Sequence, residues 1–280
     1  MSIKCIALDM DKTTLNAQGK LSEKNKEALK FAIKKGVHVV VASGRAFSAL
    51  PADVMAVEGI DYAITSNGAE IYEVAGGKCL KSYCISKDSV LKIMDLTKNQ
   101  PVTWEVFIAG QAYASSAYVD DPIKFGASSH VVDYVKRTRK RIDDIYGFIL
   151  EHASQLNSID VIVKDEQLKE QLWQQFKEEI SDIYATTSAP QLMEISSKEC
   201  GKHRGLAFIL DYLGLGCEEA AAFGDGDNDA DMLKYAGIGV AVANASKACM
   251  AVADLVVADY DDDGVAEGIY QLLEERVQEK

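Results

Sequence analysis

Long apolar segments are missing from this sequence, and positive charge is scarce. No run approaches the roughly 20 apolar residues of a membrane-spanning helix, and the basic, apolar and small-residue pattern of a signal peptide is absent. The 30 lysines and arginines are outnumbered by 43 aspartates and glutamates, for a formal net charge of −13. An acidic surface of this kind repels nucleic acid and anionic membranes. We therefore expect a cytoplasmic protein, a monomer or small homo-oligomer, that binds neither.

Patterned cysteine and histidine are lacking as well. The six cysteines are scattered without a C-x-x-C pair, so we expect reduced thiols, and the histidines show no metal-binding spacing. Internal repeats and low-complexity segments are also absent. What is present is 48% hydrophobic and 26% charged residues over 280 positions. This is the composition of a globular chain long enough for one large or two ordinary domains.

Three apolar runs near the N-terminus predict buried strands of a parallel sheet. They cover residues 3–8, 37–42 and 62–65, and helical patterns separate them. Ser22 can cap the first helix and Gly36 can end it. Strands and helices that alternate in this way predict a Rossmann-like α/β fold.

The alternation is interrupted and then resumes. A hairpin pattern surrounds Gly76 and Gly77, and the following segment mixes hairpins with helices, which predicts a separate α+β unit. Strand and helix patterns alternate again from a strand at 192–195 to a last helix at 265–277. One sheet domain with an insertion explains this more simply than two sequential domains. The predicted parts are an α/β core of residues 1–84 and 190–280, and an inserted α+β unit of residues 85–189.

Polar side chains follow four of the predicted strands, at the point where each strand ends. Carboxyl ends of parallel strands share one edge of a sheet, so we expect these groups to lie close together. Neighbouring acids repel each other unless a cation lies between them or one holds a proton, and oxygen ligands suit Mg²⁺ rather than zinc. A solvated or calcium-binding turn is the alternative for the last group. The four groups are Asp9 with Asp11, Ser43 with Gly44, Asn67 with Gly68, and residues 224–229.

These residues resemble, in order, the four motifs of the haloacid dehalogenase (HAD) superfamily of phosphohydrolases. Residues 9–13 match the first motif, Ser43 the second, Lys202 the third and residues 224–229 the fourth. The flanking residues look like those of the Cof-type subfamily, whose members carry a type IIB cap. The resemblance implies a HAD-like fold with an inserted α+β cap and an enzyme that depends on Mg²⁺.

The resemblance also implies a role for each site residue. Asp9 would attack phosphorus to form an aspartyl-phosphate, and Asp11 would protonate the leaving alcohol and then activate water. Lys202 would neutralise the nucleophile and the phosphate, with a solvated lysine as the alternative. Asp9, the carbonyl of Asp11 and Asp225 would bind Mg²⁺. The further implied residues are Ser43, the backbone N–H groups of Met10 and Gly44, Lys202 and Asn228 for phosphate binding, and Asp229, Thr13 and Asn67 for support.

Two basic residues near the motifs leave alternatives open. Similar proteins usually have Gly where Lys12 stands, and that glycine would supply a conformation that lysine adopts only at a cost. We expect the Lys12 side chain to point to solvent; a charge at the cap-facing rim is the alternative. Arg45 could reach the site, but packing of the following helix is an equal explanation.

The sequence therefore predicts a Mg²⁺-dependent phosphatase that hydrolyses a small organic phosphomonoester, such as a sugar phosphate or similar metabolite. A phosphomutase that uses the same intermediate is the alternative within enzymes. From another class, the alternative is a phospho-accepting switch or a non-catalytic metabolite-binding protein, which the complete set of motif residues disfavours. Substrate-selecting residues would lie in the cap.

Overall fold

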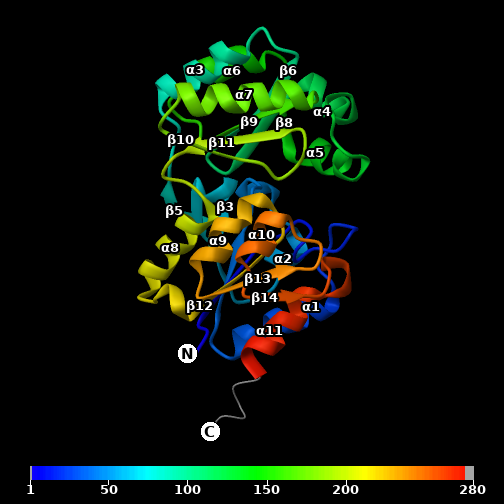
Figure 1. The fold of residues 1–280 in the computed structure, drawn as a ribbon, viewed down its shortest axis with the longest axis vertical. Helices are drawn as coiled ribbons and strands as arrows, with labels where there is room; N and C mark the ends of the chain where they lie inside the picture. Colours follow the sequence, from blue (N-terminus) through cyan, green and yellow to red (C-terminus); the bar gives the residue numbers. More distant parts are fainter. Residues whose placement is uncertain (1, 275–280) are drawn as a thin grey trace. The chain divides into compact units, whose positions relative to one another are not determined.

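Strand β1 (Cys5–Leu8), which ends just before Asp9, lies inside an eight-stranded sheet in the computed structural model (Figure 1). It pairs in parallel with β2 (His38–Ala42) on one side and β12 (Ala220–Gly224) on the other. All four of its side chains are buried. Successive side chains of a strand point to opposite faces, so both faces of the sheet are covered here. The predicted parallel α/β core is confirmed.

The other strands extend this sheet in the order β14-β13-β12-β1-β2-β3-β4-β5. All neighbours from β14 to β3 are parallel, whereas β4 is antiparallel to β3. Strand β5 follows β4 through a turn in which Gly76 and Gly77 both have positive φ, as the predicted hairpin requires. The bounds are β3 (Ile60–Thr65), β4 (Glu70–Glu73), β5 (Lys78–Ser82), β13 (Ile238–Val242) and β14 (Leu255–Val257).

Helices pack on both faces of this sheet. On one face, apolar side chains of three helices form a single cluster with Cys5 and Ala7 of β1. On the other face two helices pack against each other, and Gly268 of the second approaches the ring of Phe223. The helices on the first face are α8 (Lys202–Leu213), α9 (Ala230–Tyr235) and α10 (Lys247–Val252). The helices on the other face are α1 (Glu23–Lys34) and α11 (Gly264–Glu274). The short helix α2 (Ala52–Met55) follows Pro51.

The ends of two predicted helices can be compared with the structure. Ser22 caps α1 by accepting the N–H of Asn25, and Gly36 follows the helix with φ +79°.

The structure describes residues 2–274, so the predicted end of the last helix, 275–277, lies outside the described residues. Within 2–274, no helix combines the length and the apolar character needed to cross a membrane.

A second sheet has six strands in the order β10-β11-β9-β6-β7-β8, all antiparallel except for the last pair. Helices α3, α6 and α7 bury an apolar cluster against one face of it. The strands are β6 (Val102–Ile108), β7 (Gln111–Ser115), β8 (Arg139–Ile142), β9 (Ser158–Val163), β10 (Ile183–Thr186) and β11 (Leu192–Ser197). The helices are α3 (Lys87–Thr97), α4 (Ser116–Asp120), α5 (Val132–Thr138), α6 (Ile145–Glu151) and α7 (Glu166–Glu179).

The prediction that the strand at 192–195 belongs to the core is wrong. In the structure β11 lies between β9 and β10 of the six-stranded sheet, and Met193 and Ile195 belong to its apolar cluster. A short apolar strand pattern shows that a strand exists but not which sheet it joins. By their internal contacts, one compact unit contains residues 2–45, 50–81 and 201–274 of the described chain, and the other contains 46–49 and 82–200.

The four residues 46–49 have no sequence signal that separates them from the core. They join the second unit because the N–H of Ser48 donates to the carbonyl of Gly110 at 3.0 Å. Ala49 also packs in a small apolar cluster with Phe107 and Ala112.

Three buried carboxylates lie side by side in the second unit's sheet. Glu105 is opposite Asp160, which is opposite Glu194, and all three are at most 5% exposed. Arg139 forms an ion pair with Glu105. Burial, followed by the charges of Glu194 and Glu105, raises the pKa of Asp160 well above its usual value. Ionising Asp160 at neutral pH therefore costs free energy.

Replacing Asp160 with Asn removes this ionisation and keeps the shape of the side chain. Because the folded-state pKa lies above the unfolded value, the acid's contribution to stability is present at low pH and is lost as pH rises above about 4. We expect Asp160→Asn to raise the free energy of unfolding by on the order of 1 kcal/mol at about pH 7, and by less at about pH 4. Denaturant unfolding at both pH values measures the difference.

The matched control for this variant is Glu105→Gln. It leaves Arg139 buried without its carboxylate partner, so we expect a loss of stability at neutral pH. A destabilised Asp160→Asn protein at neutral pH would contradict the proposed cost of ionising Asp160.

Candidate active site

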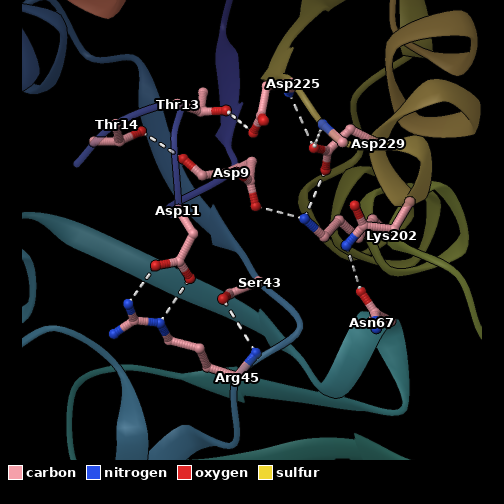
Figure 2. Close-up of polar contacts among 12 residues, drawn as sticks. Asp9, Asp11, Thr13, Thr14, Ser43, Arg45, Asn67, Lys202, Asp225 and Asp229 are labelled. Atoms are coloured by element: carbon pink, nitrogen blue, oxygen red, sulfur yellow. Dashed lines mark hydrogen bonds and ion pairs between the residues drawn. The ribbon is translucent and has the colours of Figure 1, made fainter. Parts of the chain in front are cut away.

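The carboxyl ends of β1, β2, β3 and β12 bring polar residues together at one edge of the parallel sheet (Figure 2). Asp9 follows β1 directly, Ser43 follows β2, and Asp225 follows β12. Asn67 lies in the tight turn after β3. Parallel strands all end at the same edge, which is why residues far apart in the sequence become neighbours here.

Lys202 is buried, 1% exposed, and its ammonium group binds two carboxylates. Its Nζ lies 2.6 Å from Oδ1 of Asp9 and 2.6 Å from Oδ1 of Asp229 (Figure 2). Burial alone would lower the pKa of Lys202, but the charges of Asp229 and Asp9 outweigh burial and raise this pKa above its usual value. Lys202 is therefore a permanent cation, and the alternative of a solvated lysine is wrong.

Two glycines allow the approach that directs Lys202 at Asp9. The N–H of Gly201 donates to the carbonyl of Asn67 at 2.9 Å, and a Cβ on Gly68 would lie 2.3 Å from the carbonyl oxygen of Gly201. Gly68 and Gly201 also have φ values of +90° and +127°, which side chains rarely allow. Helix α8 can therefore begin at Lys202 directly against the turn after β3.

The loop after β12 is held by hydrogen bonds to its own backbone. Oδ2 of Asp229 accepts the N–H groups of Asp225 and Gly226 at 3.1 and 3.0 Å. The hydroxyl of Thr13 donates to Oδ1 of Asp225 at 2.9 Å, which joins this loop to the loop after β1. Asp229 thus contacts Lys202 with one oxygen and the loop backbone with the other.

Crowding of acids raises two pKa values in this cluster. Burial and then the charge of Asp229 raise the pKa of Asp9 to about 7, although Lys202 acts to lower it. Burial and then the charges of Asp9 and Asp229 raise the pKa of Asp225 to about 8. Both groups therefore hold protons for part of the time at neutral pH, unless a further cation is bound nearby.

Carboxylate oxygens of Asp9, Asp225 and Asp229 lie within 4.8 Å of one another. Three oxygen donors fit a hard divalent cation such as Mg²⁺ and offer no soft ligand for zinc. The predicted ligand set took the backbone carbonyl of Asp11 as its third member. The side chain of Asp11 is not part of this group, whereas Asp229, predicted as a supporting residue, is.

The carboxylate of Asp11 binds Arg45 instead (Figure 2). Nε of Arg45 donates to Oδ2 of Asp11 at 2.8 Å, and Nη2 donates to Oδ1 at 2.5 Å. From the sequence, a place in the site and packing of the following helix are equal explanations for Arg45. Its place two residues after Ser43 is a signal for the site, but a long flexible side chain cannot be aimed from spacing alone.

The remaining predicted residues make contacts local to each strand end. Nδ2 of Asn228 donates to Oδ1 of Asn67 at 2.9 Å, which joins the loops after β12 and β3. The hydroxyl of Ser43 accepts the N–H of Arg45 at 3.2 Å across Gly44. The carbonyl of Met10 accepts the N–H groups of three later residues, Thr13, Thr14 and Leu15, and so shapes the turn after β1. The phosphate-binding roles of Met10, Ser43, Gly44 and Asn228 stay predictions.

Lys12 is exposed and adopts φ +60°, in the left-handed region. Its carbonyl accepts Nδ2 of Asn244 at 2.9 Å, so the loop is held in this conformation from the neighbouring strand end. Side chains with a Cβ adopt this region at a cost of about 1–2 kcal/mol. The expected exposure of the Lys12 side chain is confirmed, and the cost of its backbone conformation stays a prediction.

Comparison with known proteins gives consistent matches over nearly the whole chain. A family model described as haloacid dehalogenase-like hydrolase matches residues 6–269. Phosphatase YwpJ of Bacillus subtilis (strain 168) is 30% identical over 295 residues, covering 97% of this chain and 100% of that protein. The 5-amino-6-(5-phospho-D-ribitylamino)uracil phosphatase YcsE of the same organism is 25% identical over 269 residues, covering 96% and 95%. The solved structure of the HAD subclass IIB sugar phosphatase BT4131 has the same fold, with a TM-score of 0.79 at 22% identity over 96% of this chain and 98% of that one.

The conformation of Lys12 leads to a test of backbone strain. Lys12→Gly removes the Cβ at φ +60°, which stabilises the folded protein, but it also makes the unfolded chain more flexible, which partly offsets this gain. We expect a net gain of about 0.5–1 kcal/mol in the free energy of unfolding. Lys12→Ala is the matched control, because it removes the charge and keeps the Cβ. Denaturant unfolding should show a gain for the glycine variant alone. Equal stability in both variants would exclude strain at this position.

The raised pKa values of Asp9 and Asp225 lead to a test of metal binding. With the folded pKa values raised to about 7 and 8, the metal-free protein loses stability as pH rises toward 8. Mg²⁺ binds the ionised carboxylates, so its stabilising effect should grow over the same range. We expect the increase in melting temperature at one fixed Mg²⁺ concentration to be larger at about pH 8 than at about pH 6. An Asp225→Asn control should lose most of this pH dependence, and an increase independent of pH in the unsubstituted protein would contradict the assignment.

Proposed function

The chain belongs to the haloacid dehalogenase-like hydrolases, and we propose that it is a Mg²⁺-dependent member that works through an aspartyl-phosphate on Asp9. It resembles the Cof-type proteins and has the fold of a subclass IIB phosphatase. As a phosphoric monoester hydrolase of this family, it acts on small phosphorylated substrates. The proposal concerns the cofactor, the intermediate, the role of each residue and the kind of substrate.

One observation carries the proposal: the buried ammonium of Lys202 lies between Asp9 and Asp229. A carboxylate with a raised pKa is a poor nucleophile when protonated, and the cation at 2.6 Å favours its ionised form. The same positive charge offsets the repulsion between a phosphate dianion and the attacking carboxylate. A solvated acidic turn needs no buried lysine of this kind.

In the first step, an ionised oxygen of Asp9 attacks phosphorus and the bond from phosphorus to the leaving oxygen breaks. The side chain of Asp11, carrying a proton, gives that proton to the leaving oxygen, so an alcohol departs and an aspartyl-phosphate remains. The contact between Lys202 and Oδ1 orients the carboxylate of Asp9 for this attack.

In the second step, water attacks phosphorus and the bond to Asp9 breaks. Asp11, now ionised, takes the proton from the attacking water, and inorganic phosphate leaves with Asp9 restored. Mg²⁺, when bound to Asp9, Asp225 and Asp229 or the carbonyl of Asp11, supplies positive charge that neutralises the phosphoryl oxygens. Ser43, Asn228 and the N–H groups of Met10 and Gly44 would hold those oxygens.

For the substrate, we propose a small phosphorylated sugar or a similar polyol phosphate. The support is that two similar proteins are known as a sugar phosphatase and as a phosphatase of a phosphorylated ribityl compound. A panel of sugar, nucleotide and cofactor phosphates together with that ribityl compound tests this choice. Release of inorganic phosphate separates a phosphatase from a phosphomutase, which would return the phosphoryl group to the sugar.

The test of mechanism separates Asp9 from Asp11. Asp9→Asn removes the nucleophile, so we expect no turnover and no phosphoenzyme. Asp11→Asn keeps the nucleophile but loses the acid–base group, which typically contributes ~10²–10⁴-fold. An aryl phosphate leaves as a stable phenolate and needs little protonation, so its first step should be partly spared. The second step lacks its base, and aspartyl-phosphate should therefore accumulate as a burst in Asp11→Asn.

Rapid-quench detection of acid-stable, alkali-labile phosphoprotein, with the site mapped, measures this burst. The unsubstituted protein is the control, in which the second step is fast and little phosphoprotein should accumulate. Label found on Asp11, or a burst that persists in Asp9→Asn, would reverse the roles given to the two carboxylates.

A further inference from the structure

We propose that Arg45 is the positioning residue for the carboxylate of Asp11 in the second step of the reaction. This inference rests on the proposed function, because it assigns Arg45 a task only if Asp11 is the acid–base group. The observation that carries it is the two-point contact in which Nε and Nη2 of Arg45 each donate to one oxygen of Asp11 (Figure 2).

The side chain of Asp11 needs a partner to have a defined orientation. It is 57% exposed, whereas the Arg45 side chain that binds it is only 13% exposed. An exposed aspartate can turn freely about its side-chain bonds, and a single hydrogen bond would still leave its carboxylate plane free. A guanidinium that binds both oxygens fixes that plane, because its N–H groups have a rigid fork geometry.

The backbone of Arg45 is itself anchored on the two neighbouring strand ends. Its N–H donates to the hydroxyl of Ser43 at 3.2 Å, and its carbonyl accepts the N–H of Ser66 at 2.9 Å. The guanidinium therefore extends from a fixed point at the edge of the sheet. A flexible loop arginine could form the same ion pair without orienting its partner.

The geometry points to the second step in particular. Both oxygens of Asp11 act as acceptors in this contact. A base likewise presents an acceptor oxygen to the proton of the attacking water, so the contact orients Asp11 for that transfer. Orientation matters for that transfer, because a misplacement of about 1 Å can cost on the order of 10²-fold in rate.

The ion pair contributes little to folding, which makes Arg45 accessible to substitution. Exposed pairs typically contribute up to about 1 kcal/mol, and Asp11 is more than half exposed. We therefore expect Arg45→Gln to fold with a melting temperature close to that of the unsubstituted protein. If it does not, Arg45→Lys, which keeps the charge but not the fork, carries the same test.

The experiment is a double-mutant cycle on the breakdown of aspartyl-phosphate formed from an aryl phosphate. We expect Arg45→Gln to slow breakdown by about 10- to 100-fold and to change the rate of formation by less than about 3-fold. Phosphoprotein should then accumulate as a burst in Arg45→Gln. The burst in Arg45→Lys should be intermediate between those of Arg45→Gln and the unsubstituted protein. In the Asp11→Asn background the same Arg45→Gln change should have almost no further effect on breakdown, because the group it positions is gone.

Lys12→Gln is the matched control, because it removes a positive charge from the loop that carries Asp11 without removing a partner of the Asp11 carboxylate. It should give no burst. Arg45 would be a phosphate-binding residue instead if Arg45→Gln slowed formation and breakdown alike, or if it cost as much in the Asp11→Asn background. Unchanged breakdown in Arg45→Gln would exclude any positioning role. These outcomes differ from failure of the proposed function, which would appear as a burst in Asp9→Asn or no burst in Asp11→Asn.

Discussion

The buried ion pairs of Lys202 are the interaction on which the site depends. Three carboxylates, Asp9, Asp225 and Asp229, lie within 4.8 Å of one another at the edge of the sheet, and like charges this close repel strongly. The buried ammonium of Lys202 contacts Asp9 and Asp229. The close approach of Gly201 to Gly68 fixes the start of α8, from which the Lys202 side chain extends. Removing one partner of such a buried group leaves uncompensated charge, which is costly. The lysine is therefore required for the acids to share this space.

Lys202 does not balance the cluster completely. Fully ionised, the three acids carry three negative charges against one positive charge, and burial together with this excess raises the pKa values of Asp9 and Asp225. A phosphate dianion entering such a field would be repelled. One divalent cation removes the excess and makes the edge attractive to an anion, which is how an acidic protein can bind a phosphate ester. The electrostatics of the site therefore favour the binding of a divalent cation.

Much of this site could be predicted because strand ends leave local marks in a sequence. Apolar runs that stop at Asp9, Ser43 and Asp225 indicate buried strands, and the parallel rule brings their ends together. Three features left no such mark. The sheet joined by residues 192–195 depends on tertiary packing, and the direction of the Arg45 side chain depends on rotamers. The left-handed conformation of Ser66 is one that serine rarely adopts. Only at Lys12, where glycine is usual in similar proteins, did the sequence indicate strain.

The two groups of buried acids show what turns acidity into a site. Glu105, Asp160 and Glu194 lie in mid-strand positions opposite one another, where the backbone groups are already paired within the sheet. The acids at the end of the parallel sheet lie where the strands stop, so loop N–H groups can bind Asp229 and a helix can begin at Lys202. The second arrangement combines a buried lysine with oxygen donors that could hold a metal, next to the carboxylate that we propose as the nucleophile. Position at the strand ends, rather than the number of acids, therefore identifies the reactive group.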